Sequence, residues 1–307
     1  MSISGSRSTM CALAIAVVAQ LGCDAPEPDG GATSEDDAIS QVYTGKLTVA
    51  QAQSACRCAL EVVPVGGTVF HFGVDLTQNP PAFFPFQSTI AGARVSIAEL
   101  PVTKLLNVRS DSDGNWAVKV IKVKGKPAHA SFVYELAGYQ TTKSQVFEIG
   151  SDGITDIAAQ VPTAAYYGLA KAAIEQQISA IIGAPYTLNN VLVTTVGKSW
   201  ASMYNPVTPH GDPGVQVSID PPAQFPLSVG PLYFNEQVQV DATLTSTSVD
   251  GGVFFGNLPV GRQTVTASKA PFSYDALTFS IQDGIALYVA SPPHATQGTN
   301  DSPAGQP

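Results

Sequence analysis

The chain has 307 residues, of which 44% are hydrophobic and only 13% are charged, whereas roughly 25% are charged in an ordinary globular protein. This hydrophobic content is enough to build real cores, which excludes a chain with no folded part. With 15 basic and 24 acidic residues, the net charge of −9 argues against nucleic acid as a partner.

Residues 1–22 are typical of an export signal. A short polar segment with Arg7 precedes an apolar run at 10–21, which is too short to span a bilayer that needs about 20 helical residues. The run ends in Leu21-Gly22-Cys23, which resembles the processing site of bacterial lipoproteins. The resemblance implies cleavage before Cys23 and attachment of acyl chains such as palmitate to this residue. Ordinary signal cleavage and an uncleaved anchor are the alternatives.

Residues 23–40 are predicted to be a disordered acidic tether. Six acidic residues but one basic residue lie in the first 40 positions, and the segment after Cys23 is rich in Pro, Gly and small residues. Such a segment buries too little apolar area to fold and extends by self-repulsion. We interpret it as a spacer between the membrane and the folded body.

Residues 41–161 are predicted to form a first β-sandwich domain, after a short helix within 48–62. In the first strand, 68–76, the alternation places Phe70, Phe72, Val74 and Leu76 on the core face and His71 and Asp75 on the other. A proline-broken loop at 79–88 follows. Turn signals then separate six further strands, expected at 92–99, 104–110, 115–122, 129–136, 144–149 and 154–160.

Residues 162–184 are predicted to form a connecting helix, because apolar side chains recur at helical spacing and Gly183 fits a helix end. A second sandwich domain is expected at 185–292 and a disordered tail at 293–307. The strands of this second domain are expected at 190–197, 214–219, 231–234, 238–245, 252–256, 262–268, 276–281 and 285–290. The fold class is therefore mainly β: two antiparallel Ig-like or prealbumin-like sandwiches joined by one helix.

Two segments of the body repeat one pattern of strand, Asp-Gly turn, aromatic strand, loop and strand. They run from Asn107 to Tyr139 and from Leu244 to Ala267. Both resemble carboxypeptidase regulatory-like domains, which are prealbumin-like sandwiches. The second copy fits better, although Gln263 stands where an aromatic is usual, whereas the first copy lacks the Pro-x-Gly loop of the family. Residues 165–293 also resemble a recurrent architecture of predicted lipoproteins from myxobacteria. These resemblances imply a fold and a non-catalytic accessory role.

The candidate site residues are few. Asp111, Asp113 and Asn115 alternate oxygen ligands around Gly114 as calcium loops do, but the distal acidic ligand is missing and a hairpin turn is the commoner explanation. His210 and Asp212 lie in a Pro/Gly loop and could line a ligand site or simply be solvated. Cys56 and Cys58 could be bridged, which requires a turn between them, or could be free thiols or serve redox, metal or intermolecular roles.

No sequence motif of a hydrolase elbow, zinc protease, P-loop or dinucleotide fold is present. We therefore expect no enzyme activity, no cofactor and no metal. The hypothesis is a lipoprotein of the bacterial cell envelope, facing the periplasm or the cell surface, with a structural or adhesive role. Its expected partners are the membrane and an envelope protein or glycan. The alternative is a glycan- or protein-binding accessory module using the loops at 79–90 and 205–214; an enzyme of unrecognised type ranks below both.

Overall fold

The computed structural model describes residues 35–80, 82–84, 88–100, 103, 106–197, 211–290 and 294–295. The chain divides into two compact units, Met1–Cys58 and Ala59–Pro307, and each is considered by itself. The expected signal segment 1–22, the acylation site Cys23 and most of the expected tether lie outside the described residues.

The first unit contains two short helices, α1 (Glu35–Tyr43) and α2 (Val49–Cys56). The expected tether is therefore wrong for residues 35–40, which are helical. Within α1, Ala38, Ile39 and Tyr43 are buried. Thr48 begins α2 with a reciprocal cap, because its side chain accepts the Gln51 N–H and its own N–H donates to the Gln51 side chain.

Helix α2 ends earlier than the expected range of 48–62. Arg57 takes a left-handed conformation with φ of 52°, and its N–H donates to the carbonyls of Gln53 and Ser54. This cap ends the helix at Cys56. From Leu60 the chain is extended, because the run of valines at 62, 63 and 65 suits a strand.

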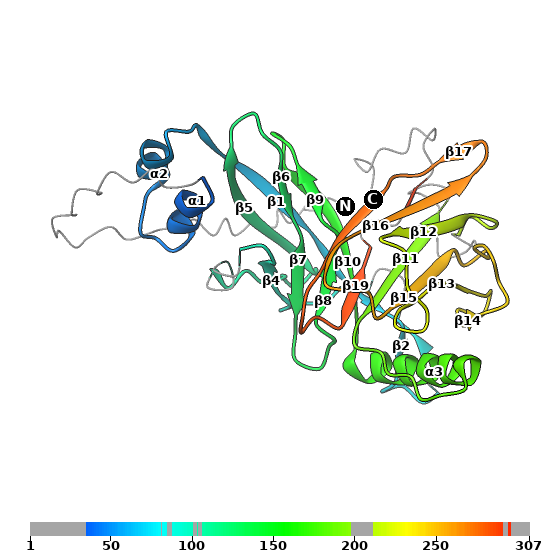
Figure 1. Ribbon diagram of the computed structural model, residues 1–307. Coiled ribbons are helices and arrows are strands. Elements are labelled where there is room, and N and C mark those ends of the chain that lie inside the picture. The colour runs from blue at the N-terminus through cyan, green and yellow to red at the C-terminus, as the bar shows by residue number, and fades with distance from the viewer. Residues whose placement is uncertain are drawn as a thin grey trace, which may run out of the picture. The chain divides into compact units, whose positions relative to one another are not determined.

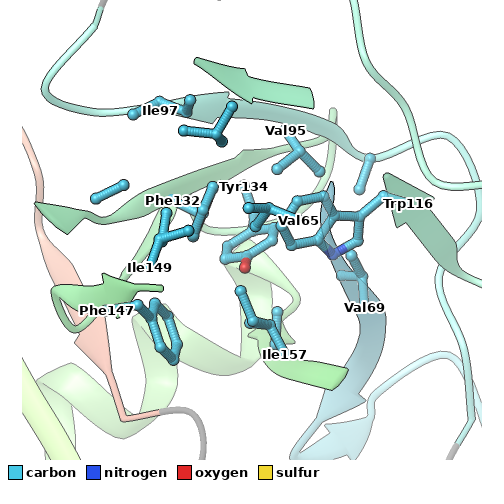
Figure 2. Close-up of a cluster of buried hydrophobic side chains, with 14 of the residues drawn as sticks. Val65, Val69, Val95, Ile97, Trp116, Phe132, Tyr134, Phe147, Ile149 and Ile157 are labelled. Atoms are coloured by element: carbon cyan, nitrogen blue, oxygen red, sulfur yellow. The ribbon is translucent and has the colours of Figure 1, made fainter. Parts of the chain in front are cut away.

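The first half of the second unit is a β-sandwich around one apolar core (Figures 1 and 2). One layer is the sheet β10–β1–β5, and the other contains β4, β7 and β8 together with the β6–β9 pair. The strands of this half are β1 (Leu60–Phe72), β2 (Val74–Asp75), β3 (Ala82–Phe83), β4 (Arg94–Ile97), β5 (Asn115–Val123), β6 (Ala128–Ala130), β7 (Phe132–Glu135), β8 (Thr142–Ser144), β9 (Phe147–Ile149) and β10 (Ile154–Pro162).

The face assignment of the first strand is wrong. Val63, Val65 and Val69 enter the core, whereas Phe70 and Phe72 are only half-buried on the other face. Phe72 packs edge-on against Tyr166, with ring centroids 6.2 Å apart. The alternation of side chains in the sequence does separate the two faces of the strand. The outer face also carries aromatic side chains, so the sequence alone makes it look like the core face.

The second half is layered around the second core. The sheet β14–β13–β15–β11–β19 packs on the sheet of β12, β16, β17 and β18, and α3 covers the opposite face of the former (Figure 1). Its elements are α3 (Ala164–Ile182), β11 (Val191–Gly197), β12 (Gln216–Asp220), β13 (Val229–Phe234), β14 (Val240–Asp241), β15 (Gly252–Gly256), β16 (Gly261–Lys269), β17 (Phe272–Ser273), β18 (Leu277–Ile281), β19 (Leu287–Val289) and β20 (His294–Ala295).

Other expected elements also differ from the structure. The strand expected at 129–136 is divided between β6 and β7, and the one expected at 144–149 contains β9 and only the last residue of β8. The strand expected at 104–110 is not formed over its described residues 106–110, where Arg109 makes only an isolated bridge to Arg94. The strand expected at 238–245 is reduced to β14, because the Asp241 carboxylate binds the N–H and hydroxyl of Thr243 and turns the chain. The tail expected from 293 includes β20, which pairs with β11.

One sheet runs through both halves. Strand β8 of the first half pairs in parallel with β19 of the second, so the order continues from β14 to β4 without a break. The Val146 N–H also donates to the Thr278 carbonyl in β18. Most pairings in the described part of the chain are antiparallel, as expected, but β1–β10, β11–β20 and the two pairings of β19 are parallel. The domain boundaries at 161 and 185 stay a prediction.

Candidate functional site

Asp212 is the described member of the predicted ligand loop, and it lies at the centre of a polar cluster. Its side chain is 3% exposed. One carboxylate oxygen accepts from the Lys269 ammonium at 2.6 Å and the other from the Tyr274 hydroxyl at 2.7 Å. The same ammonium donates to the Pro213 carbonyl at 2.8 Å. His210 lies outside the described residues.

The backbone positions this carboxylate firmly. The Asp212 N–H donates to the Val196 carbonyl at 2.8 Å, and its carbonyl accepts from the Thr247 hydroxyl at 2.5 Å. A side chain at Gly211 would collide with the Gly251 backbone, at 2.2 Å from its nitrogen, so only glycine allows this approach. The loop is thereby closed on the end of the second sandwich.

The electrostatics of the cluster favour a structural clamp. Burial and then the adjacent Asp212 carboxylate raise the pKa of Tyr274, so the phenol stays protonated and continues to donate. Lys269 neutralises the carboxylate and lies 5.7 Å from the Phe272 ring. Both carboxylate oxygens are therefore engaged, and the arrangement holds the 211–214 loop against the β16–β17 hairpin.

A second cluster joins β1 to the proline-broken loop. The His71 ring stacks on Phe84 with centroids 4.1 Å apart, and its Nδ1 lies 3.3 Å from the Tyr139 hydroxyl. Burial lowers the pKa of His71, while the charge of nearby Asp75 opposes the shift, which favours a neutral ring. All these side chains are partly exposed, so they form an aromatic surface with a hydroxyl and an imidazole at its edge.

The predicted calcium candidate forms an internal turn. One Asp111 carboxylate oxygen accepts the N–H groups of Asp113 at 2.9 Å and Asn115 at 2.8 Å. The Asn115 side-chain oxygen in turn accepts from the Thr68 hydroxyl at 2.8 Å. One oxygen of Asp111 and the side-chain oxygen of Asn115 are thus used at the turn that leads into β5. Within the described ranges, no three His, Cys, Asp or Glu side chains come together as a metal site would require.

Cys56 and Cys58 are joined by a disulfide, with Cα atoms 5.2 Å apart. A regular helix or strand would hold these two side chains apart, and the left-handed Arg57 between them supplies the required turn. The helix end and the bridge are therefore one local feature of the sequence Cys-Arg-Cys.

Sequence reasoning missed Lys143, Lys269, Tyr274 and the contact of His71 with Tyr139. Lys143 lies in β8, fully buried, and donates to the Ser280 carbonyl at 2.7 Å. Each of these contacts joins residues far apart in the chain, which no local spacing encodes. The only signal in the sequence was Lys143, a single lysine in a segment that otherwise has the composition of a strand.

Comparison with known proteins adds little to this geometry. No family model and no curated protein matches the chain. Among solved structures, the Bacillus anthracis TIE protein is 13% identical at a TM-score of 0.22, over 74% of this chain and 33% of that one. The chain therefore spans about a third of that protein's length.

Two pilins show the same low similarity. The shaft pilin spaA from Lactobacillus rhamnosus GG is 9% identical at a TM-score of 0.21, over 78% of this chain and 99% of the pilin. BcpA, the major pilin subunit of Bacillus cereus, is 10% identical at 0.24, over 79% of this chain and all of the pilin. At these TM-scores the overlap carries no argument about this chain. None of the described helices is long and apolar enough to cross a membrane.

Proposed function

We propose that this chain is a lipid-anchored protein of the bacterial cell envelope with a structural or adhesive role and no catalysis. The observation that carries the proposal is the sheet that continues from β14 to β4 through both halves. Neither half can turn relative to the other without breaking the β8–β19 ladder, so the body is suited to act as a stiff spacer. The Asp212 carboxylate is bonded to Lys269 and Tyr274, and one Asp111 oxygen is bonded within its own turn.

The export part of the proposal rests on two cysteine features. Cys23 ends an apolar run as lipoprotein processing sites do, and each buried CH₂ of an attached acyl chain would contribute about 0.8 kcal/mol to membrane binding. The Cys56–Cys58 disulfide is typical of an oxidising compartment outside the cytoplasm.

Intact-mass spectrometry of the chain extracted from the membranes of its native cell tests the anchor. We expect a product that begins at Cys23 and carries acyl chains. Cys23→Ser should remove the acyl mass and release the protein from the membrane fraction, whereas Cys11→Ser, within the segment expected to be removed, should change neither. A product beginning at Met1, or an unacylated Cys23, would refute lipid anchoring.

The role is tested separately, by crosslinking in the intact envelope and by assays on the purified chain. Crosslinking in the intact envelope should capture one envelope component reproducibly, and a broad panel of ester, peptide and glycoside substrates should show no turnover. Turnover of any substrate by the wild type, lost in a variant of a clustered residue such as Tyr274→Phe, would contradict the non-catalytic assignment.

The aromatic surface at His71 and Phe84 favours a second candidate, a glycan- or protein-binding accessory module. Stacked rings beside a hydroxyl are suited to the apolar face of a sugar ring. A glycan array gives the test: binding should be lost in Phe84→Ala and kept in Phe272→Ala, whose ring is 48% exposed elsewhere. If the wild-type protein binds no glycan on the array, the glycan-binding function is refuted.

A further inference from the structure

Two polar atoms inside the first core have no hydrogen-bond partner among the described residues: the Tyr134 hydroxyl and the Trp116 indole Nε1. The two residues are 1% and 4% exposed. Their rings meet edge-on, with centroids 6.0 Å apart and planes at 69°. Figure 2 shows the Tyr134 oxygen and the Trp116 nitrogen on the side of the cluster where Val69 and Ile157 lie.

Ser96 Oγ and Gln263 Oε1 are the other buried side-chain atoms without a partner in the described part of the chain, but other buried tyrosines are bonded. The buried Tyr233 accepts the Val217 N–H at 3.0 Å, and the buried Tyr288 binds both the N–H and the carbonyl of Gln282. An unsatisfied buried polar group destabilises the fold, because it has lost its bonds to water without gaining others. Two such groups in one core therefore call for a partner.

The chemistry of the two groups restricts that partner. An indole N–H can only donate, so the partner must offer an acceptor, which excludes a cation. The surrounding side chains include Val69, Phe132 and Ile157, all apolar, so a desolvated anion would be strongly disfavoured. A small neutral molecule that both accepts and donates fits both groups, and water is such a molecule.

The backbone offers further partners at the same core. Pairing between β1 and β10 is interrupted, because Val65 is opposite Ile154 but Gly67 is opposite Ile157. The register thus leaves one extra residue on β10 beside core positions Val65 and Ile157. An internal water requires two to four polar partners, and an interrupted ladder is a common source of free backbone groups.

We propose that one water molecule is held inside the first core, accepting from the Trp116 indole N–H and bonded to the Tyr134 hydroxyl. The site rests on side chains of β5 and β7 and is independent of the lipid anchor and of the proposed function. It makes Tyr134 a bonded core residue whose hydroxyl stabilises the fold.

Water–proton rotating-frame Overhauser spectroscopy on the full chain with ¹⁵N-labelled tryptophan tests the site directly. We expect a cross-peak of direct-contact sign between water and one indole N–H that is protected from exchange. Trp116→Phe should remove that indole signal, which assigns it against Trp200, and Tyr134→Phe should weaken the cross-peak. A protected Trp116 indole without a water cross-peak overturns the proposal.

Urea unfolding gives a second test, because a core with the water and a core without it predict opposite changes in stability for Tyr134→Phe. With the water present, Tyr134→Phe breaks a bond and should raise the unfolding equilibrium constant about fivefold, in the same direction as the control Tyr233→Phe, whose hydroxyl has a visible partner. In a dry core, Tyr134→Phe removes an unsatisfied hydroxyl and should lower that constant. A lowered constant overturns the proposal even if a variant proves too unstable for spectroscopy.

Discussion

At the scale of single residues, Gly67 sets how closely β10 approaches β1. A methyl group at this position would lie 1.9 Å from the Ile157 carbonyl oxygen, so the two strands would have to separate. We expect Gly67→Ala to lower the free energy of unfolding by about 3 kcal/mol. Gly150→Ala is the control, because nothing lies within 4 Å of its added methyl group. Equal urea midpoints for the two variants would contradict this account.

Lys143 is a second residue whose surroundings decide its energetic effect. Its amine is fully buried, with the Ser280 carbonyl as acceptor and the Tyr288 ring centroid 6.0 Å away. Burial lowers the pKa of Lys143, and the charge of Glu99 opposes the shift. The unfolded chain therefore binds more protons than the folded chain as the pH falls below about 10.4, and this group destabilises the fold most at the lower pH.

We expect Lys143→Met to raise the free energy of unfolding by about 1 kcal/mol at neutral pH. The gain should shrink as the pH rises toward the unfolded lysine pKa, because the wild type recovers there. Chemical unfolding of both chains at several pH values measures the difference. Lys122→Met should instead lower the free energy of unfolding, since it removes the ion pair of Lys122 with Glu61. A gain that is constant with pH would argue against the titration of Lys143.

At the scale of elements, α3 shows how two glycines of one helix differ. Gly168 lies in an exposed helical turn with nothing within 4 Å of an added methyl, whereas Gly183 caps the helix with φ of 69°. Gly168→Ala should stabilise the protein by about 0.5–1 kcal/mol, because alanine restricts the unfolded chain and favours helix. Gly183→Ala should destabilise it by a similar amount. Thermal midpoints moving in the same direction would disprove this reading.

The elements themselves could be predicted largely from local sequence. Strands β5, β11 and β15 lie within one residue of their expected bounds and helix α3 within two, since side-chain period and turn residues act locally. The core face of β1 could not be chosen, because Phe72 on the outer face has its own partner in Tyr166. Among site residues, Asp212 was singled out, but its partners Lys269 and Tyr274 lie 57 and 62 residues away and share no spacing with it.

At the scale of the whole molecule, the parallel ladder of β8 with β19 decides how the two halves unfold. The ladder extends from Thr142 opposite Leu287 to Ser144 opposite Val289, and Lys143 and Val146 add bonds to β18. Unfolding either half alone would break these hydrogen bonds and leave the strand of the other half without its partner. Two sandwiches joined only by a helix would unfold independently, whereas halves that share a sheet should unfold together.

Native-state hydrogen exchange tests this coupling. Phe279→Ala opens a cavity in the second core and should lower its stability by about 3–5 kcal/mol. If the halves are coupled, the slowest-exchanging amides of β7, in the first half, should lose the same free energy of protection as those of β16. Val260→Ala, at a side chain that is 61% exposed, should change neither strand. Protection of β7 that is unaffected by Phe279→Ala would show that the shared sheet joins the halves in space without coupling their stability.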